Sequence, residues 1–406
     1  MHLAAHWAAA TPDAPVLHVL TVDHGLQPGS ARVAQQVCAQ AASLSLPCAI
    51  LRWRGQKPAT GIEQAAREAR YALLGEWCQR HDAALVTAHT LNDQAETFLM
   101  RLMRGAGVDG LSAMPRQGTV PGTHPAVPLL RPLLDVPRAR LRATLRAMDI
   151  TWHEDPANAD ERFERTRLRR LLPLLEEVGL TPSALATSAR RLRRARAALE
   201  AQTTAFLRRH ARLHALGWAE LPRPAFNAQP AEIRLRVLAR LLGAHGGSGA
   251  PLRDMAGLER LLRWLEHEPG HARTLGGAHI ARRKHVLVIG REPGRPGPAL
   301  TLTPDTPAAT WDNRFHITIE NLRAPVRVCM LAELTSTATA PSPPLPSRPK
   351  KTPAFAWRSQ PAVIRGETIL ALPAIGWQAQ DAPFRQASAT PLPPPWAAAK
   401  PDENEG

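Results

Sequence analysis

Hydrophobic and polar positions in the first hundred residues alternate between strand-like and helix-like patterns. Three short apolar runs, Val16–Val22, Cys48–Trp53 and Ala84–Ala88, predict buried strands. Between these runs, a helix capped by Ser30 and a second helix over residues 61–80 place apolar side chains at helical spacing. The alternation predicts an α/β fold with a doubly wound parallel sheet and helices on both faces.

A long helix is expected to follow this α/β region. Thr181-Pro182 is a typical helix start, with proline at the first helical position. Apolar residues then recur every seven positions, at Leu185, Leu192, Leu199, Phe206 and Leu213. The pattern predicts a helix that ends near Gly217 and bridges two domains.

The remaining residues predict smaller C-terminal modules. Helices at Ala231–Leu242 and Leu252–His267, with a strand pair near Thr274–Ala281 and His285–Ile289, predict a small α+β domain over residues 217–295.

Proline becomes frequent beyond Pro293. Ala338–Pro353 predicts a mobile linker and residues 390–406 a disordered tail, in a region with room for a small β module. The chain is therefore expected to divide into four parts, over residues 1–180, 181–216, 217–295 and 296–406.

Charge adds a polyanionic partner to this picture. The chain has 51 Lys and Arg residues against 35 Asp and Glu residues, a formal net charge of +16. An excess of this size favours nucleic acid binding. Because arginine, alanine and proline are abundant throughout and lysine is scarce, a GC-rich genome is an alternative explanation that charge alone leaves open.

Several classes of protein are not supported by the sequence. No run of 18 apolar residues predicts a membrane span, and the first residues do not form a secretory signal. The four cysteines form no CxxC pair and no metal-binding spacing with histidine; they are Cys38, Cys48, Cys78 and Cys329. This usage is typical of a reducing cytoplasm and argues against a disulfide framework.

The segment Ala88–Gly105 carries the clearest candidate chemistry. His89, Asp93 and Glu96 follow a predicted strand and are spaced to share one face of the helix that begins there. Such a cluster suits Mg²⁺-phosphate or an incoming amine. The alternative is a polar first helical turn, in which the acidic residues complement the helix dipole.

A family resemblance favours the chemical interpretation. His89-x-x-x-Asp93-x-x-Glu96-Thr97, followed by Arg104-Gly-Ala-Gly107, closely resembles the HxxxDxxET and RGxG segments of tRNA(Ile)-lysidine synthetases. Other stretches agree with that family in order and spacing: Val22–Leu26, Gly61–Tyr71, Arg131–Leu134, Asp155–Asn158 and Arg165–Pro173. The resemblance covers residues 16 to about 180, weakens through 217–295 and is faint beyond residue 300. It implies that the small α+β domain over residues 217–295 is of the tRNA-recognition type.

The resemblance implies an ATP-pyrophosphatase (PP-loop) fold of Rossmann-like type and an ATP-dependent ligase that uses Mg²⁺. The reaction it implies adenylates the C2 oxygen of the wobble cytidine in a tRNA(Ile) with a CAU anticodon. The ε-amine of L-lysine then attacks C2 and expels AMP, which leaves lysidine. A cytoplasmic location fits this reaction, and a homodimer is left open.

The resemblance also implies roles for single residues. Asp23 and His24 would lie near the adenine and His89 near the phosphates, whereas Asp93 would orient the lysine amine or Mg²⁺ with support from Glu96. The arginines fall into two implied groups: Arg67, Arg70 and Arg104 toward the nucleotide or tRNA, and Arg165 and Arg169 toward the negative charge that develops near the cytidine.

Two departures from the family pattern change what is expected of this chain. Thr166 stands where the family usually has asparagine, and the 406 residues contain no Ser-Gly-Gly-x-Asp-Ser phosphate loop. The first residues resemble the helix that follows that loop, so we expect a truncated start, a sheet without its first strand and an inactive chain as given. The alternatives are a catalytically inactive tRNA-binding fragment and a related tRNA sulfur-transfer enzyme, which the lack of a CxxC pair disfavours.

The predicted bridging helix presents arginines opposite its leucine stripe. Arg190, Arg193, Arg194 and Arg196 could follow a tRNA backbone by sequence-independent phosphate contacts. The alternative is an ordinary solvated helix face.

Overall fold

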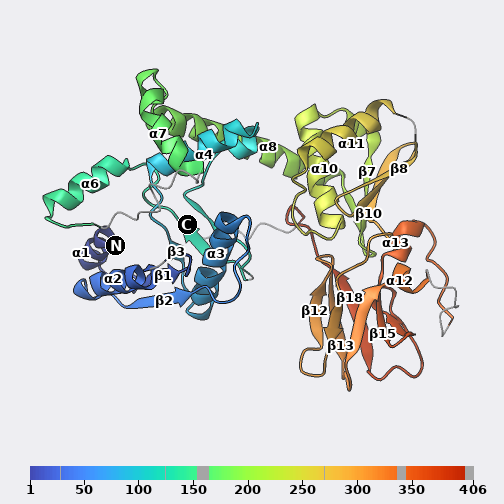
Figure 1. The fold of residues 1–406 in the computed structure, drawn as a ribbon. Coiled ribbons are helices and arrows are strands. Elements are labelled where there is room, and N and C mark those ends of the chain that lie inside the picture. The colour runs from blue at the N-terminus through green and yellow to red at the C-terminus, as the bar shows by residue number, and fades with distance from the viewer. Residues whose placement is uncertain (28, 124, 153–163, 269, 336–343, 398–406) are drawn as a thin grey trace. The chain divides into compact units, whose positions relative to one another are not determined.

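A computed structural model describes the chain except for residues 28, 124, 153–163, 269, 336–343 and 398–406. The described chain forms two compact units, Met1–Arg196 and Ala197–Gly406 (Figure 1). The boundary between the units falls inside helix α8 (Pro182–His210). No helix among the described residues combines the length and apolar character needed to cross a membrane.

The first unit has the predicted α/β fold, with its parallel strands in two small sheets. In one sheet β1 (Val19–Asp23) pairs in parallel with β2 (Cys48–Arg52). In the other, β3 (Leu85–Val86) pairs in parallel with β5 (Pro128–Leu130), which pairs antiparallel with β4 (Gln117–Thr119). The third predicted strand is therefore two residues long rather than five.

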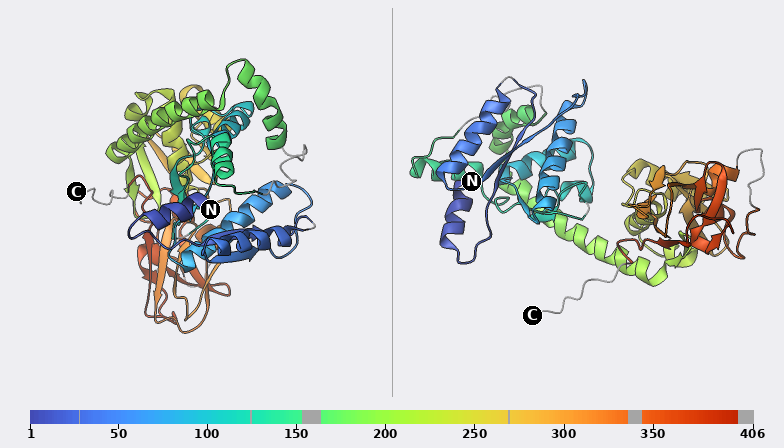
Figure 2. Two further views of the ribbon diagram at one scale, coloured as in Figure 1. Left: turned by 90° about the vertical axis from the view of Figure 1, so that its left-hand side faces the viewer. Right: turned by 90° about the horizontal axis from the view of Figure 1, so that it is seen from below.

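Helices cover both of these sheets (Figure 2). Helix α2 (Ser30–Ser43) packs on β1 and β2, and α3 (Ile62–Arg80) contacts β1, β2 and β3. Ser30 is not the N-cap that the sequence predicted, because Gly29 occupies that position with a left-handed backbone (φ +94°). The Ser30 hydroxyl instead donates to Asp23 Oδ1 at 2.7 Å and ties the helix start to the end of β1.

The rest of the first unit is helical. Its remaining helices are α1 (His2–Ala10), α4 (Leu91–Met103), α5 (Val108–Leu111), α6 (Arg138–Ala147) and α7 (Glu164–Glu177). One apolar core joins α4, α7 and the start of α8 through Phe98, Leu99, Leu168, Leu172 and Leu185. This core holds the start of α4 in place beneath the candidate site.

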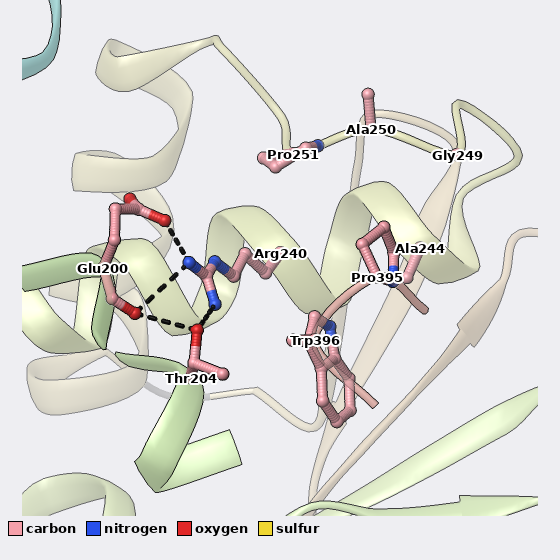
Figure 3. Close-up of a pocket in the computed structure, with 9 residues that line it drawn as sticks. All are labelled: Glu200, Thr204, Arg240, Ala244, Gly249, Ala250, Pro251, Pro395 and Trp396. Carbon is pink, nitrogen blue, oxygen red and sulfur yellow. Dashed lines mark hydrogen bonds and ion pairs between the residues drawn. The ribbon is translucent and has the colours of Figure 1, made fainter. Parts of the chain in front are cut away.

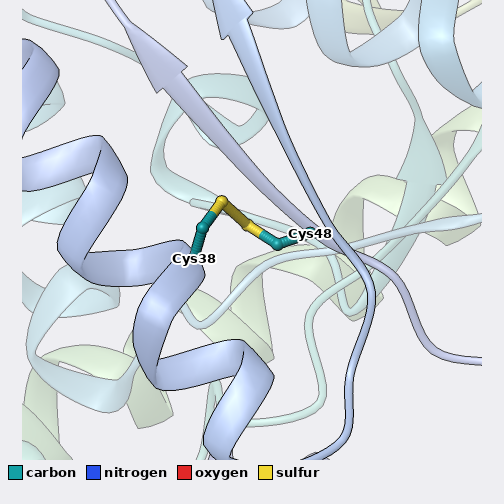
Figure 4. The surroundings of a disulfide bond; sticks show 2 residues. All are labelled: Cys38 and Cys48. Atoms are coloured by element: carbon teal, nitrogen blue, oxygen red, sulfur yellow. A yellow bond between two sulfur atoms is a disulfide. The ribbon is translucent and has the colours of Figure 1, made fainter.

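A disulfide joins α2 to β2 (Figure 4). Cys38 and Cys48 are bonded with their Cα atoms 5.3 Å apart, whereas Cys78 and Cys329 are free and buried. The sequence argued against a disulfide, and that interpretation was wrong for this pair. The two cysteines are ten residues apart in the sequence, and that spacing does not indicate a bond. They meet because α2 packs on β2, the strand that follows it.

Helix α8 ends earlier than the leucine pattern predicted. It stops at His210, because β6 (Arg212–His214) begins a hairpin that turns at Gly217 (φ +71°) into β7 (Trp218–Pro222). Leu213, the last residue of the seven-residue repeat, therefore lies in a strand and is 38% exposed.

The second unit begins with a five-stranded sheet in the order β6-β7-β10-β9-β8. The predicted strand pair is three strands, β8 (Ala272–Leu275), β9 (Ala278–Arg282) and β10 (Val286–Arg291), because Gly276 and Gly277 turn with positive φ inside the first predicted run. Helices α10 (Ala231–His245) and α11 (Met255–His267) pack on this sheet, in agreement with the prediction (Figure 1). The short helix α9 (Arg223–Asn227) precedes α10.

Two further sheets occupy the C-terminal part. One has the order β11-β14-β15-β16-β17 and the other β12-β13-β18. Their strands are β11 (Leu300–Leu302), β12 (Ala308–Trp311), β13 (Phe315–Glu320), β14 (Val326–Met330), β15 (Pro361–Arg365), β16 (Thr368–Leu372), β17 (Trp377–Gln378) and β18 (Gln386–Pro391). The short helices α12 (Leu331–Thr335) and α13 (Ala354–Arg358) and a 3₁₀ turn at Pro373–Ile375 connect them.

The predicted disordered tail is partly folded. Its first two residues, Thr390 and Pro391, are the end of strand β18 and pair with β13, and Trp396 is buried in the core to which α10 contributes. The proline-rich composition suggested disorder, but burial of one large tryptophan side chain anchors the segment to the core. Residues 398–406, and residues 338–343 of the predicted linker, lie outside the described chain.

Candidate active site at the start of helix α4

Helix α4 begins with a reciprocal cap that fixes Asp93. The Asp93 carboxylate Oδ2 accepts hydrogen bonds from the backbone N–H of Thr90 at 2.8 Å and from its hydroxyl at 2.7 Å. Burial raises the pKa of Asp93, but these hydrogen bonds and the charge of Arg138 outweigh it, so its pKa lies below the usual value. Asp93 is therefore an ionised carboxylate at neutral pH.

Glu96, one turn further along α4, is fully buried among arginines. Arg169 Nε donates to Glu96 Oε1 at 2.7 Å, and Arg165 Nε lies 3.7 Å from Oε2. Both arginines come from α7. The structure thus brings together four of the residues to which the resemblance assigned roles, Asp93, Glu96, Arg165 and Arg169. Buried carboxylates are stabilised by such complementary hydrogen-bond donors.

Arg138 completes this cluster, and the sequence analysis missed it. Its Nη2 lies 3.4 Å from Asp93 Oδ1 and 3.7 Å from Glu96 Oε1, so it bridges the two carboxylates. The backbone N–H of Arg138 donates to Asn92 Oδ1 at 2.9 Å, which joins the first turn of α6 to that of α4. In the sequence, only its position shortly after the Arg131–Leu134 stretch could have pointed to this arginine.

His89 lies just before this cap, outside α4, so the prediction that it shares a helix face with Asp93 and Glu96 was wrong. Its Nδ1 is 2.9 Å from the Thr87 hydroxyl. Burial lowers the pKa of His89, and nearby arginines add to this effect against the opposing charge of Asp93. His89 is therefore a neutral imidazole at neutral pH, able to donate or accept a hydrogen bond near a phosphate.

A second group of predicted residues meets at the end of β1. His24 Nε2 lies 3.2 Å from Arg70 Nη2, and His24 Nδ1 is buried without a hydrogen-bond partner among the described residues. Asp23 Oδ1 accepts from Ser30 and from the Gly25 N–H, and the pKa of Asp23 is lowered, first by the Ser30 hydrogen bond. Asp23, His24 and Arg70 are thus neighbours in the structure.

Arg67, another arginine of the predicted nucleotide group, is close enough to His89 for its charge to help lower the pKa of that histidine. The Arg67 guanidinium lies over the Tyr71 ring, 5.1 Å from its centre. Arg104 forms an ion pair with Glu164, at the start of α7, the helix that carries Arg165 and Arg169. The Asp155–Asn158 stretch lies outside the described residues.

The arginines of α8 differ in what they contact. Arg193 Nη2 donates to the carbonyls of Ser112 at 2.8 Å and Met114 at 2.6 Å, so this guanidinium holds α8 against the first unit's core. Arg190 and Arg196 are exposed and face Asp135 and Asp109 at 3.8 Å and 3.5 Å. Arg194 is exposed.

The described residues contain no group of three or more His, Cys, Asp and Glu side chains that could hold a metal ion. Magnesium, however, commonly binds one or two protein carboxylates and completes its shell with water and substrate phosphates. Asp93 and its surroundings fit that second arrangement and do not fit a metal cage built by the protein alone.

Comparison with known proteins gives the family. Residues 1–175 match the family model of the PP-loop domain. A tRNA(Ile)-lysidine synthase of Rhodopseudomonas palustris is 44% identical over 313 residues, which cover 73% of this chain and 88% of the relative. The corresponding enzyme of Ruegeria pomeroyi is 38% identical over 371 residues, covering 90% of this chain and 84% of the relative. The chain, with its Asp93–Glu96 cluster on the family's HxxxDxxET segment, belongs to the tRNA(Ile)-lysidine synthase family.

Proposed function

We propose that this protein forms lysidine at the wobble cytidine of a tRNA(Ile) with a CAU anticodon, using ATP and L-lysine. The observation that carries the proposal is the cluster of two carboxylates and three arginines at the start of α4. The cluster offers an anionic site for an amine next to cationic groups for a phosphate, which are the two needs of this ligation. Membership in the family supports the same reaction.

The proposed reaction has two steps. The C2 oxygen of the cytidine attacks the α-phosphate of ATP, so that a C–O–P linkage forms and pyrophosphate leaves. The ε-amine of lysine then attacks C2, AMP leaves with the oxygen, and the amine loses a proton. Each step develops negative charge on phosphate oxygens, which fixed guanidinium groups stabilise.

Asp93 has a specific role in this proposal. Its ionised carboxylate attracts the lysine ammonium group or one Mg²⁺ ion, and the Thr90 cap keeps the side chain in one rotamer. Mg²⁺, when bound, would neutralise charge on the ATP phosphates. Glu96 holds Arg165 and Arg169 so that they face the charge that develops near the cytidine.

The end of β1 is proposed to receive the adenine. His24 is neutral because burial and the nearby Arg70 lower its pKa; Arg70 donates to its Nε2, so Nδ1 carries the proton and can donate to a ring nitrogen of the adenine. The neighbouring Asp23 is held ionised by Ser30 and is placed to accept from the adenine amino group.

A phosphate loop is the part of the family pattern that the 406 residues do not contain. Among the described residues, β1 pairs only with β2 and β3 only with β5, while α3 contacts both β1 and β3. A parallel strand between β1 and β3 would join the two sheets and carry a Ser-Gly-Gly-x-Asp-Ser loop to their carboxyl ends.

The proposal is tested by following ATP. A chain extended at its N-terminus by a strand and a Ser-Gly-Gly-x-Asp-Ser loop should release pyrophosphate when tRNA(Ile) with a CAU anticodon is present, and not with the same tRNA carrying GAU. Equal release with both tRNAs, or none with either, would contradict the proposed substrate. The 406-residue chain alone should bind the tRNA without releasing pyrophosphate.

A further inference from the structure

Arg138 is loosely held at the cluster at the start of α4. Its Nη2 lies 3.4 Å from Asp93 Oδ1 and 3.7 Å from Glu96 Oε1, and no other partner of its guanidinium is found among the described residues. Arg169, by contrast, donates to Glu96 Oε1 at 2.7 Å. The Arg138 side chain is 34% exposed, whereas Asp93 is 13% exposed and Glu96 is inaccessible. Arg138 is therefore the side of this contact that solvent reaches most easily.

An arginine of the second unit shows how a firmly bound guanidinium differs. Arg240 Nη1 donates to the Thr204 hydroxyl at 2.7 Å, and its Nη2 pairs with Glu200 (Figure 3). Short charge-assisted hydrogen bonds of this kind are strong, whereas the longer contacts of Arg138 are mainly electrostatic. Moving the Arg138 side chain therefore costs less free energy than moving that of Arg240.

The backbone at Arg138 is fixed independently of its side chain. Arg138 is the first residue of α6 and follows Pro137 at the N-cap, and its N–H donates to Asn92 Oδ1 at 2.9 Å. The dipole of a helix disfavours a cation at the N-terminal end. The helix thus does not stabilise the Arg138 cation, and its attraction to Asp93 and Glu96 is what holds the guanidinium in place.

The charges of the cluster favour an exchange of cations over the addition of one. Two carboxylates face three guanidinium groups, so positive charge is already in excess. An ammonium group that entered beside Arg138 would increase that excess, whereas one that replaced Arg138 would leave the local charge unchanged. The ammonium group of lysine carries three donors, and Asp93 Oδ1 and Glu96 Oε1 are suitable acceptors for them.

We propose that the Arg138 guanidinium occupies the position of the substrate ammonium group, and that L-lysine binds by displacing it. Arg138 is then a positioning residue, which holds the carboxylates of Asp93 and Glu96 and lowers the affinity for lysine by competing with it. The inference rests on the proposed function, which brings lysine to Asp93, and goes beyond it by assigning this competition to Arg138.

A matched pair of variants in the full chain tests the competition. Arg138→Gln and Arg140→Gln remove the same charge from α6, but Arg140 is exposed and forms no ion pair among the described residues. Calorimetric titration with L-lysine should show affinity about tenfold higher for Arg138→Gln than for the wild type, because a partly exposed ion pair no longer competes. Arg140→Gln should bind lysine like the wild type, and Arg138→Lys, which restores a cation, should do the same.

A second measurement uses the wild-type chain and does not depend on the folding of any variant. Phenylglyoxal modifies accessible guanidinium groups, and mass spectrometry of peptides locates the modified arginines. Saturating L-lysine should raise the rate at which Arg138 is modified and leave the rate at Arg140 unchanged, because displacement moves the Arg138 guanidinium into solvent. An arginine that only braces the fold would keep its rate or be protected.

The outcomes separate this inference from the proposed function. Equal or weaker lysine binding by Arg138→Gln, or an Arg138 modification rate that lysine does not raise, would overturn the competition and leave lysine at the site. Nε-acetyl-lysine lacks the ammonium charge and should not bind. Binding of Nε-acetyl-lysine as tight as that of lysine, or no lysine binding by any of these proteins, would contradict the proposed lysine site and this inference with it.

Discussion

At the residue scale, hydrogen-bond donors and arginines that lie close by stabilise the carboxylates at the start of α4, although these carboxylates are largely buried. Asp93 is held ionised by Thr90 and Arg138, and Glu96 is fully buried against Arg165 and Arg169. Removing one charged side chain from this cluster leaves the opposite charges of its partners partly buried and unpaired. The contacts therefore predict the effect of each substitution.

Replacing Asp93 by asparagine should separate chemistry from binding. Asparagine keeps the side-chain shape and can still accept from Thr90, but it has no charge to attract the lysine amine or Mg²⁺. In the loop-extended chain, Asp93→Asn should reduce lysine transfer by at least about 10³-fold and leave tRNA affinity within a few-fold. Loss of tRNA affinity in this variant would assign Asp93 to the fold instead.

Replacing Glu96 by glutamine should mainly destabilise the first unit. The change removes the charge that Arg165 and Arg169 share, and the arginines are only partly exposed. We expect a loss of about 3 kcal/mol in the free energy of unfolding, measured by urea denaturation. Arg67→Gln, at a position outside the cluster, is the control and should change this value by less than about 1 kcal/mol.

The sequence could identify the site residues that lie in a motif, but not those that reach the site only through a tertiary contact. His89, Asp93 and Glu96 were found because they lie in one motif, of which only Asp93 and Glu96 are on helix α4. Arg165 and Arg169 were found because they share a second motif. Arg138 was missed because its role comes from the meeting of α4 with α6, through Asn92 and the two carboxylates. The spacing of these residues along the sequence does not indicate that contact.

At the element scale, α8 carries arginines of two kinds. Arg193 is bonded to two backbone carbonyls, whereas Arg190, Arg194 and Arg196 are exposed. The sequence placed all four on one polar face and could not distinguish them, because the distinction depends on which part of that face meets the Ser112–Met114 turn.

The three exposed arginines should set the salt dependence of tRNA binding. Changing Arg190, Arg194 and Arg196 to glutamine should make the slope of log affinity against log salt concentration shallower by roughly 0.7 to 0.9 for each phosphate that is no longer neutralised. Helix propensity is nearly unchanged, so the melting temperature should stay constant. An unchanged slope would mean that these side chains form a solvated face only.

The Cys38–Cys48 link between α2 and β2 gives a second prediction at this scale. Because it closes a loop of about ten residues, Cys38→Ser should lower the free energy of unfolding by about 2–3 kcal/mol. Reducing agent should lower the stability of the wild-type chain by a similar amount and leave Cys38→Ser unaffected. If reducing agent changes neither protein, the two cysteines are thiols in solution.

At the scale of the whole molecule, the sequence predicted the α/β fold of the first unit and the helices of the second unit better than it predicted the C-terminal sheets. Strong period-3.6 patterns identified α10 and α11. The β strands beyond residue 300 are short and lie between prolines, so their pairing rests on contacts between distant segments, such as β13 with β18. A composition rich in proline therefore suggested disorder where the chain is folded.

We propose that the cluster at the start of α4 carries out lysine transfer to tRNA. The most direct measurement is mass spectrometry of nucleoside 34 from tRNA(Ile) after incubation with ATP, lysine and the loop-extended chain. We expect lysidine at that position with this chain and unmodified cytidine with its Asp93→Asn variant. Lysidine formed equally by the variant, or unmodified cytidine with both proteins, would show that the α4 cluster does not carry out the transfer.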